Sequence, residues 1–236
     1  MDVSTAVDRR RSTRAFLPRP VPDAVLRDVL SRALRAPSGG NTQPWHVYVV
    51  SGDAKAALAA AAKAKALETG GVPSADAEFA VYPTAKSNPP APPEFLPRRR
   101  KLGFTMFELM GIARDDGEAR TNAMLANFDF FGAPVGLIVT VDRACDRNGW
   151  GHVGAFLMAV TLLAAERGLG SCLQEAWGNL GDTVYEHLGI DRRTEAVWCG
   201  VALGYADPAA KVNTLRSERD GFDAKVRHVA TSKAKL

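Results

Sequence analysis

The pattern of hydrophobic and polar positions predicts a chain in which helices and strands follow one another. Residues 22–36 place Val25, Leu26, Val29, Leu30 and Ala33 at helical spacing, which predicts an amphipathic helix. Residues 53–69 predict a second helix, which a pair of glycines ends. Other apolar runs predict strands at 46–50, 135–141 and 195–203 and a short helix at 182–188.

Residues 151–167 predict a helix that is apolar almost all round. A helix without a polar face belongs in a core or in a subunit interface. Its small residues Gly151, Gly154, Ala155 and Ala159 allow another helix to approach closely. The most apolar part, residues 153–165, is too short to span a bilayer, so we expect no membrane association.

The stretch 72–103 is rich in proline, and we therefore expect neither a strand nor a long helix there. A long ordered loop in a compact domain is usually a lid or a binding loop. We expect helical character over 104–128, a loop over 168–177, and a polar tail from Asp207 that ends in an alternating segment at 224–230. Strands separated by helices favour a three-layer α/β arrangement.

Composition narrows the class of protein. The 236 residues are 46% hydrophobic and 24% charged, which is enough for a sizeable core. The net charge is +4, but the basic residues are not interleaved with stacking aromatics, so we expect no nucleic-acid partner. Cys145, Cys172 and Cys199 are widely spaced and no secretory signal precedes them, which predicts a reducing cytoplasm and no metal site.

Several common catalytic motifs are missing from the sequence. It contains no GxSxG, no HExxH and no P-loop, and no GxGxxG opens a helix after the first strand. Gly168 and Gly170 follow a predicted helix and so indicate its C-terminal cap. A hydrolase triad, a zinc enzyme and a dinucleotide-fold dehydrogenase are therefore all disfavoured.

Three polar clusters remain, and the first is at the N-terminus. Alternate residues of an extended segment point the same way, so Arg10, Ser12 and Arg14 can converge on one anion. Two guanidiniums and a hydroxyl suit a phosphomonoester better than a carboxylate. The alternative is a solvated run of charge.

The second cluster occupies residues 37–45 and the third residues 168–177. In the second, two glycines let the backbone approach a flat ligand, and Ser38, Asn41 and Gln43 supply donors and acceptors. The alternative is an ordinary turn between a helix and a strand.

These clusters together resemble the nitroreductase family of FMN flavoproteins, in its nitrobenzoate-reductase-like branch. The resemblance is carried by Arg-x-Ser-x-Arg-x-Phe from residue 10, Pro-Ser-x-x-Asn-x-Gln-Pro-Trp from residue 37, and Gly-Leu-Gly with Gln-Glu-Ala-Trp from residue 168. Residues 213–219 are similar to the branch's closing phosphate motif. Gly221 stands where a proline usually follows, which leaves the choice between Arg216 and Arg219 open.

The resemblance implies an α+β fold, a three-layer α/β/α sandwich with a mixed, mostly antiparallel central sheet. It implies one domain over residues 1–236, with a variable lid insert at about 72–110 and a C-terminal arm at about 207–236. It also implies an intertwined homodimer with FMN at the interface, to which the apolar helix would contribute.

The resemblance also implies the site. The expected cofactor-binding residues are Arg10, Arg11, Ser12, Arg14, Pro37, Ser38, Gly39, Asn41, Gln43, Gln174, Glu175, Ala176, Arg216 and Arg219. The loop 37–43 would come from the partner subunit, and the backbone of Glu175 or Ala176 would lie near the flavin N5. No catalytic side chain is required. The expected substrate contacts are Tyr82, Phe95, Phe104 and Phe107.

The implied activity is two-electron, ping-pong reduction of a small nitroaromatic compound by NADPH or NADH, from nitro through nitroso to hydroxylamine and amine. Two alternatives stay open. The first is reductive dehalogenation or other flavin chemistry on the same fold, for which Glu94, Lys86 and Lys101 would clamp a zwitterion. The second is a flavin-binding protein without turnover.

Overall fold

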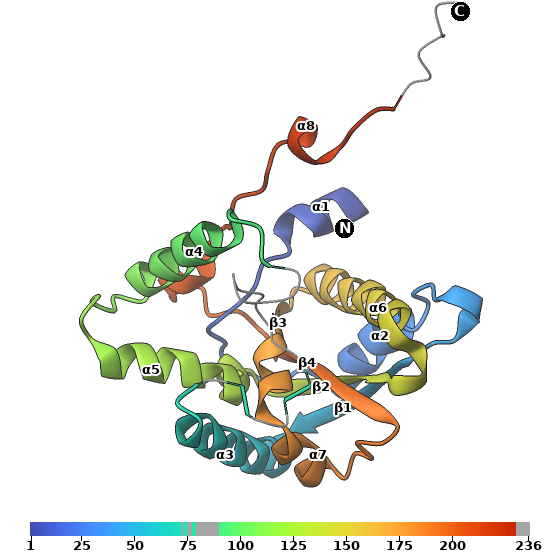
Figure 1. The fold of residues 1–236 in the computed structure, drawn as a ribbon, viewed down its shortest axis with the longest axis horizontal. Helices are drawn as coiled ribbons and strands as arrows, with labels where there is room; N and C mark the ends of the chain where they lie inside the picture. Colours follow the sequence, from blue (N-terminus) through green and yellow to red (C-terminus); the bar gives the residue numbers. More distant parts are fainter. Residues whose placement is uncertain (72, 75–76, 79–89, 230–236) are drawn as a thin grey trace, which may run out of the picture.

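The computed structural model describes residues 1–71, 73–74, 77–78 and 90–229, which form a four-stranded sheet with helices on both faces (Figure 1). Its helices and strands are α1 (Val3–Arg9), α2 (Asp23–Ala33), β1 (Trp45–Ser51), α3 (Gly52–Glu68), α4 (Phe95–Leu109), α5 (Gly117–Leu125), β2 (Val135–Asp142), α6 (Asp146–Glu166), β3 (Gly170–Gln174), α7 (Asp182–Leu188), β4 (Glu195–Gly204) and α8 (Phe222–Lys225). Short 3-10 helices are η1 (Gly39–Asn41), η2 (Ala126–Gly132), η3 (Arg143–Cys145), η4 (Glu175–Leu180) and η5 (Lys211–Thr214).

The sheet has the strand order β1-β2-β4-β3, and all pairings between these strands are antiparallel. A parallel contact occurs at an isolated bridge between Ser12 and Ser171. The predicted strands at 46–50, 135–141 and 195–203 and the helices at 22–36, 53–69 and 182–188 are confirmed, with small shifts at their ends. The expected three-layer sandwich with a mostly antiparallel sheet is also confirmed.

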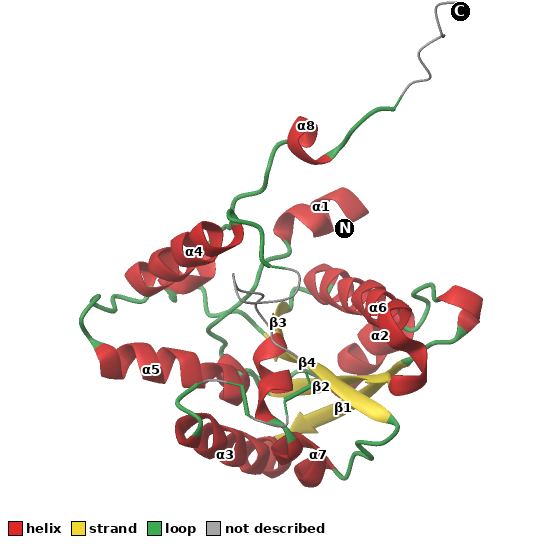
Figure 2. Ribbon diagram, in the orientation of Figure 1, coloured by secondary structure: helices red, strands yellow, loops and turns green. Residues whose placement is uncertain are grey.

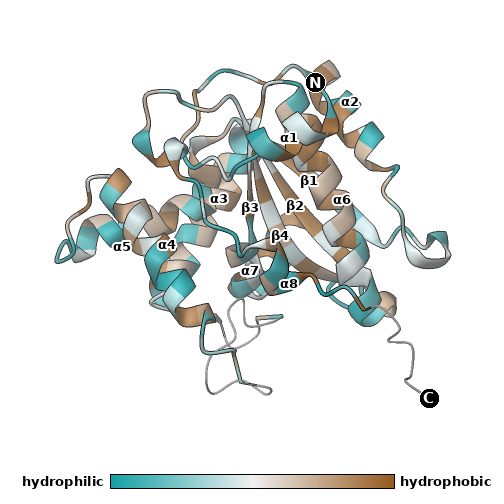
Figure 3. Ribbon diagram, turned by 90° about the horizontal axis from the view of Figure 1, so that it is seen from above, coloured by the Kyte–Doolittle hydropathy of each residue, from teal (hydrophilic) through white to brown (hydrophobic). Residues whose placement is uncertain are grey.

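Helices α2 and α6 cover one face of the sheet, and α3 and α7 cover the other (Figure 2). On β2, Leu137 and Val139 pack toward α6, and Ile138 packs toward α3, because successive strand residues point to opposite faces. Hydrophobic residues accordingly run along the strands in the middle of the molecule (Figure 3). Both central strands are therefore apolar on two sides, which explains their unbroken hydrophobic sequences.

Helix α6 begins at Asp146, five residues before the predicted start. It belongs to the stretch Arg143–Glu166, which among the described residues is the one helix long and apolar enough to cross a membrane by length and composition. In the fold it is a core helix, since Val153, Phe156 and Val160 are fully buried against the sheet.

The prediction that the proline-rich stretch 72–103 forms no long helix was wrong at its end. Helix α4 begins at Phe95 and contains Pro97 in its first turn. A proline is tolerated there because the first backbone N–H groups of a helix have no partner within the helix. Tyr82 lies outside the described residues.

The helical character expected over 104–128 is found, divided between α4 and α5. Gly111 has a φ of +71° and ends the helical run after α4, and α5 begins at Gly117. The side chain of Asp116 caps α5 by accepting a hydrogen bond from the Ala119 N–H at 2.9 Å.

One further prediction was wrong nearer the C-terminus. Residues 168–177 are not one loop, because β3 pairs with β4 and η4 follows it. The alternating segment at 224–230 begins in helix α8, which stands away from the body of the chain (Figure 1). Earlier in the tail, Val212, Asn213 and Leu215 are buried against the chain's own body.

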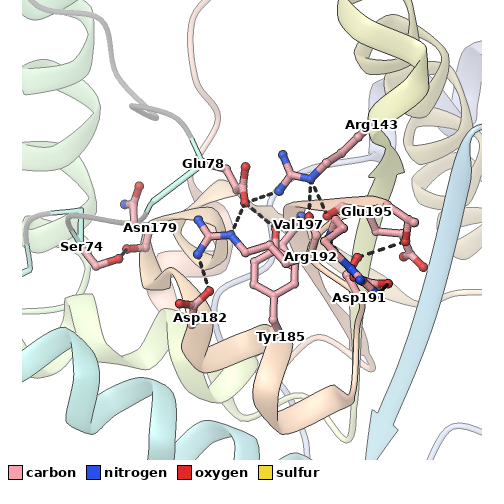
Figure 4. Close-up of polar contacts among 12 residues, drawn as sticks. Ser74, Glu78, Arg143, Asn179, Asp182, Tyr185, Asp191, Arg192, Glu195 and Val197 are labelled. Atoms are coloured by element: carbon pink, nitrogen blue, oxygen red, sulfur yellow. Dashed lines mark hydrogen bonds and ion pairs between the residues drawn. The ribbon is translucent and has the colours of Figure 1, made fainter.

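A cluster of charged residues joins the described part of the insert to the sheet (Figure 4). The Glu78 carboxylate accepts hydrogen bonds from Arg143 at 2.5 Å, Tyr185 at 2.8 Å and Arg192 at 3.2 Å. Tyr185 also accepts one from the Val197 N–H of β4 at 2.8 Å. Burial raises the pKa of Glu78, but the hydrogen bonds from Arg143 and Tyr185 and the two cationic charges outweigh it, so the pKa is lowered overall.

We expect Glu78→Gln to lower the free energy of unfolding at pH 7 by about 2 kcal/mol, because two partly exposed arginines lose their shared carboxylate. A carboxyl whose pKa is lower in the folded protein than in the unfolded chain stabilises the folded protein at pH values above the unfolded pKa. This stabilisation is lost as the pH falls through the folded pKa. The difference in free energy of unfolding between the unaltered protein and Glu78→Gln should therefore shrink below about pH 4.5. Urea unfolding at several pH values measures it, with the exposed Glu186→Gln as a control; a difference that stays constant with pH contradicts the assignment.

Candidate functional site

The N-terminal segment (residues 10–16) is extended and lies between two distant parts of the chain. The Thr13 N–H donates to the Ser171 carbonyl of β3 at 2.9 Å, and Phe16 bridges Ala206. The Arg14 N–H donates to the Asn213 side chain at 2.8 Å. These contacts hold the segment extended, so that successive side chains point to opposite sides, as the sequence prediction assumes.

Arg10, Ser12 and Arg14 lie together on one side of this segment. Burial raises the pKa of the Cys172 thiol, and the charge of Arg14, a hydrogen bond with Ser12 and the charge of Arg10 all oppose that rise. Thr13 is 2% exposed on the other side, where a Cβ on Gly170 would lie 2.5 Å from its Oγ1. The extended backbone therefore sets Thr13 against β3, and the convergence of Arg10, Ser12 and Arg14 on one anion stays a prediction.

Asn213 is a positioning residue that the sequence reasoning missed. Its Nδ2 donates to the carbonyls of Ala15 at 2.8 Å and Asp207 at 2.9 Å, while its Oδ1 accepts from Arg14. Because Asn213 is 5% exposed, these bonds are shielded from water. The sequence could have pointed to Asn213 only through its place in the motif at 213–219. Its role depends on the N-terminal segment, about 200 residues away in the chain.

The other N-terminal and C-terminal arginines are more exposed. Arg11 is exposed. Arg216 donates to the Asp8 carbonyl, so it lies beside the end of α1 and near Arg10. Arg219 donates to the Ser217 hydroxyl at 2.7 Å and to the Glu218 carbonyl at 2.9 Å. Arg216 is thus the one tied to the N-terminal segment, and Arg219 folds over its own stretch of chain.

The loop at 37–45 forms a compact, exposed turn. Gly40, Asn41 and Gln43 have φ values of 59°, 56° and 48°, and the Gln43 N–H donates to the Ser38 Oγ at 3.0 Å. The Gly39 N–H donates to the Nε2 atom of His152 on α6 at 3.1 Å. A side chain on Gly39 would press on this imidazole, since its Cβ would lie 3.1 Å from Nε2.

The loop and the N-terminal segment do not meet within one chain. Trp45, at the end of the loop, aligns through Val141 with Ala196 of β4, whereas Ser171 aligns with Leu203. These two levels are seven residues apart along β4, roughly 23 Å at 3.3 Å per residue. Pro37, Ser38, Gly39, Asn41 and Gln43 are consequently separated from Arg10, Ser12 and Arg14.

The third cluster begins on β3 and ends in η4. Gln174 is 2% exposed, and its Nε2 donates to the Asn127 carbonyl at 2.6 Å. Its buried Oε1 has no hydrogen-bond partner among the residues that the structure describes. Burial raises the pKa of the neighbouring Glu175 carboxyl.

The described aromatic residues among the expected substrate contacts line two different cavities. Phe104 and Phe107 line one cavity of about 220 Å³, with Arg114 and Arg120 stacked over their rings at 5.1 Å and 5.0 Å. Phe95 lines a different and larger cavity.

The residues proposed for a zwitterion clamp are not brought together. Lys101 forms an ion pair with Glu218 at 2.7 Å, Glu94 is exposed at the start of α4, and Lys86 lies outside the described residues.

Comparison with known proteins agrees with this arrangement. The model of the Nitroreductase family matches residues 7–205. A 4-nitrobenzoate reductase of Pseudomonas putida is 36% identical over 219 residues, which cover 93% of this chain and 92% of the relative.

Solved structures that are similar to this chain are also nitroreductases. The FMN and NADPH-dependent nitroreductase NfnB from Sphigopyxis sp. strain HMH has a TM-score of 0.88 and 36% identity, with 98% of this chain and 100% of that chain covered. The FMN-dependent nitroreductase NfnB from Mycobacterium smegmatis, solved in complex with NADPH, has a TM-score of 0.83 and 30% identity, with 97% of this chain and 100% of that chain covered.

Proposed function

Because the chain belongs to the nitroreductase family, we propose that it is an FMN-dependent oxidoreductase that uses NADPH or NADH to reduce nitroaromatic compounds. Relatives that match nearly its whole length are named for nitrobenzoate, nitrobenzene and chloronitrobenzene reduction. We propose that residues 1–236 act as one domain in the cytoplasm.

The observation that carries this proposal is the extended N-terminal segment beside β3, in which Arg10, Ser12 and Arg14 alternate with the buried Thr13. Two guanidiniums and a hydroxyl on one side of a backbone held in place by Asn213 fit a phosphate group. Arg216, which donates to the Asp8 carbonyl, extends this donor set, and Arg219 and Arg11 are further proposed contacts. The residues present therefore fit the phosphate and ribityl end of FMN.

The residues at the end of β3 fit the flavin ring. The Gln174 side chain is anchored to the Asn127 carbonyl, and the backbone of Glu175 and Ala176 opens η4 beside it. When bound, FMN supplies the two-electron redox chemistry, and the chain supplies binding, orientation and exclusion of water. Phe104 and Phe107 are proposed to contact the flat acceptor, and Phe95 and Tyr82 remain further proposed contacts.

A homodimer would complete this site. The loop at 37–43 is too far from the N-terminal segment of its own chain, so it serves the partner's flavin in this proposal. One face of α6 carries Gly151, Ala155, Met158 and Leu162 at helical spacing. Met158 is 41% exposed in the single chain. An exposed apolar face on an otherwise buried helix supports its role as the subunit interface. In the arm predicted at about 207–236, Glu218 and Asp220 pair with α4 of their own chain, so the part after residue 220 is proposed to cross the partner.

We expect Arg14→Gln to weaken FMN binding roughly tenfold, because one charge-assisted hydrogen bond to phosphate is lost. Flavin retained per protein chain and the dissociation constant from flavin fluorescence measure it. Arg27→Gln, on the exposed side of α2, serves as the control and should bind FMN like the unaltered protein. Equal FMN affinity in the two variants would contradict the phosphate assignment.

The activity itself is tested by mixing purified protein with NADPH or NADH and 4-nitrobenzoate or nitrobenzene. We expect oxidation of the nicotinamide to depend on the nitro compound, with hydroxylamine or amine products. A flavin-loaded protein that oxidises neither nicotinamide with any of these acceptors would refute the proposed function and favour a flavin-binding role.

A further inference from the structure

The loop at 37–43 lies on the surface in a conformation that its sequence alone does not favour. Residues 39–43 are all exposed. Gly40, Asn41 and Gln43 nevertheless adopt left-handed backbone conformations, with φ values of 59°, 56° and 48°. Glycine adopts this conformation freely and asparagine tolerates it, but it costs energy for a residue such as Gln43. An exposed loop keeps this shape only if hydrogen bonds hold it.

Two kinds of hydrogen bond act on the loop. The Asn41 N–H donates to the Ser38 carbonyl at 3.0 Å, and the Gln43 N–H donates to the Ser38 Oγ at 3.0 Å. These bonds shape the turn but do not set its direction relative to the rest of the chain. Among the described residues, the hydrogen bond that joins the loop to another element runs from the Gly39 N–H to Nε2 of His152 at 3.1 Å.

This hydrogen bond depends on a close approach between the loop backbone and the imidazole ring. A Cβ at Gly39 would lie 3.1 Å from Nε2 and 3.3 Å from Cε1 of His152. A larger residue would therefore push the ring or the loop away, whereas glycine lets the N–H reach the ring. Because Nε2 accepts the bond, the proton of the neutral imidazole lies on Nδ1.

His152 lies on a helix that is well suited to hold the loop. It precedes Val153, which is fully buried in the core, so the backbone at this point of α6 is fixed by packing. It follows Gly151, the first residue of the α6 face that is proposed as the subunit interface. A core helix thus presents the acceptor that holds an exposed loop beside the proposed interface.

We propose that His152 is a positioning residue for the flavin site, because through the Gly39 N–H it holds the loop at 37–43 in the conformation that receives the partner's FMN. The inference rests on the proposed function and adds a residue that acts through this loop. A ligand binds only the fraction of the protein that is in the competent conformation. The dissociation constant for FMN therefore rises by the factor by which the competent fraction of the loop falls.

His152→Phe and His152→Gln test the proposal. Phenylalanine keeps a ring at this position but has no acceptor, whereas the Gln Oε1 is an acceptor at a similar distance from the backbone. We expect His152→Phe to raise the dissociation constant for FMN roughly fivefold, because one neutral hydrogen bond is lost, and His152→Gln to restore most of the affinity. Titration followed by flavin fluorescence measures both.

His187→Phe is the matched control, because His187 is exposed on α7, on the other face of the sheet. This variant should bind FMN like the unaltered protein. A His152→Phe protein that binds FMN as tightly as the unaltered protein overturns the proposal. So does a His152→Gln protein that binds FMN as weakly as His152→Phe.

Hydrogen exchange separates this inference from the proposed activity. In the FMN-loaded protein, the backbone amides of the loop should exchange roughly fivefold faster in His152→Phe than in His152→Gln or the unaltered protein. Loop exchange that does not change, or exchange that rises equally over the whole chain, overturns the assignment of His152. The measurement needs neither nicotinamide nor acceptor. A protein that binds FMN but oxidises no nicotinamide therefore refutes the proposed function and leaves the assignment of His152 standing.

Discussion

Met158→Glu is expected to convert the proposed homodimer into monomers and to lower nitroaromatic reduction at least about 100-fold. Met158 is 41% exposed on α6, although the same helix buries Val153 and Phe156 in the core. A carboxylate placed in the middle of an apolar interface would have to be desolvated in both subunits at once. Each 1.4 kcal/mol changes the dissociation constant of the dimer tenfold, so a cost of several kcal/mol per buried charge is enough to separate the subunits.

The loss of activity follows from the division of the site between two chains. The loop at 37–43 and the N-terminal segment lie at opposite ends of β4, so a monomer retains only part of the proposed flavin site. Light scattering after size exclusion measures the mass, and absorbance measures the flavin per chain. Leu67→Glu is a matched control, because Leu67 is an exposed apolar residue on α3, on the other face of the sheet. A Met158→Glu protein that remains dimeric and fully loaded with flavin would contradict the assigned interface.

Gly200→Ala is expected to lower the free energy of unfolding by at least about 3 kcal/mol. Trp177 of η4 lies directly over Gly200 of β4, and an added Cβ would be 2.2 Å from its Cδ1 atom. The indole cannot move aside easily, because it is 1% exposed and stacks on Phe130 at 4.6 Å, with Phe128 against its edge at 5.5 Å. Relief of the clash therefore requires a shift of η4.

A shift of η4 also moves the proposed flavin contacts, because Glu175 and Ala176 are its first residues. We therefore expect Gly200→Ala to weaken FMN binding as well as stability. Urea and thermal unfolding and flavin titration measure the two effects. Gly103→Ala is the control, since nothing lies within 4 Å of its Cβ position in α4 and alanine favours a helix by about 0.5–1 kcal/mol. The same stability in both variants would show that the Gly200–Trp177 contact has no special role.

Local sequence patterns were sufficient for most of the architecture. The apolar runs of β1, β2 and β4 and the spacing of apolar residues on α2 and α3 depend on neighbouring residues only, and these elements are confirmed. The prediction that Arg10, Ser12 and Arg14 converge followed in the same way from the alternation of an extended segment. Their convergence and their role at the flavin phosphate stay predictions that the variant experiments test.

The errors came from contacts between distant parts of the chain. Strand β3 was read as a loop because its five residues contain Gly170, Ser171 and Gln174, which do not favour a strand by themselves. Pairing with β4 stabilises it, and such pairing is not visible in the local sequence. Helix α4 was missed because the proline content of the whole stretch hid the fact that Pro97 occupies a first turn.

The sequence by itself determined the family, the order of most elements and the residues of the N-terminal segment, because these depend on spacing over a few positions. Only the tertiary structure decided which of the predicted residues meet. It placed the 37–45 loop at the opposite end of the sheet, gave Asn213 its three hydrogen bonds, and closed the cavity between α4 and residues 215–220 with two ion pairs. Each of these depends on packing between segments that are far apart in the chain, and burial and strand register decide such packing.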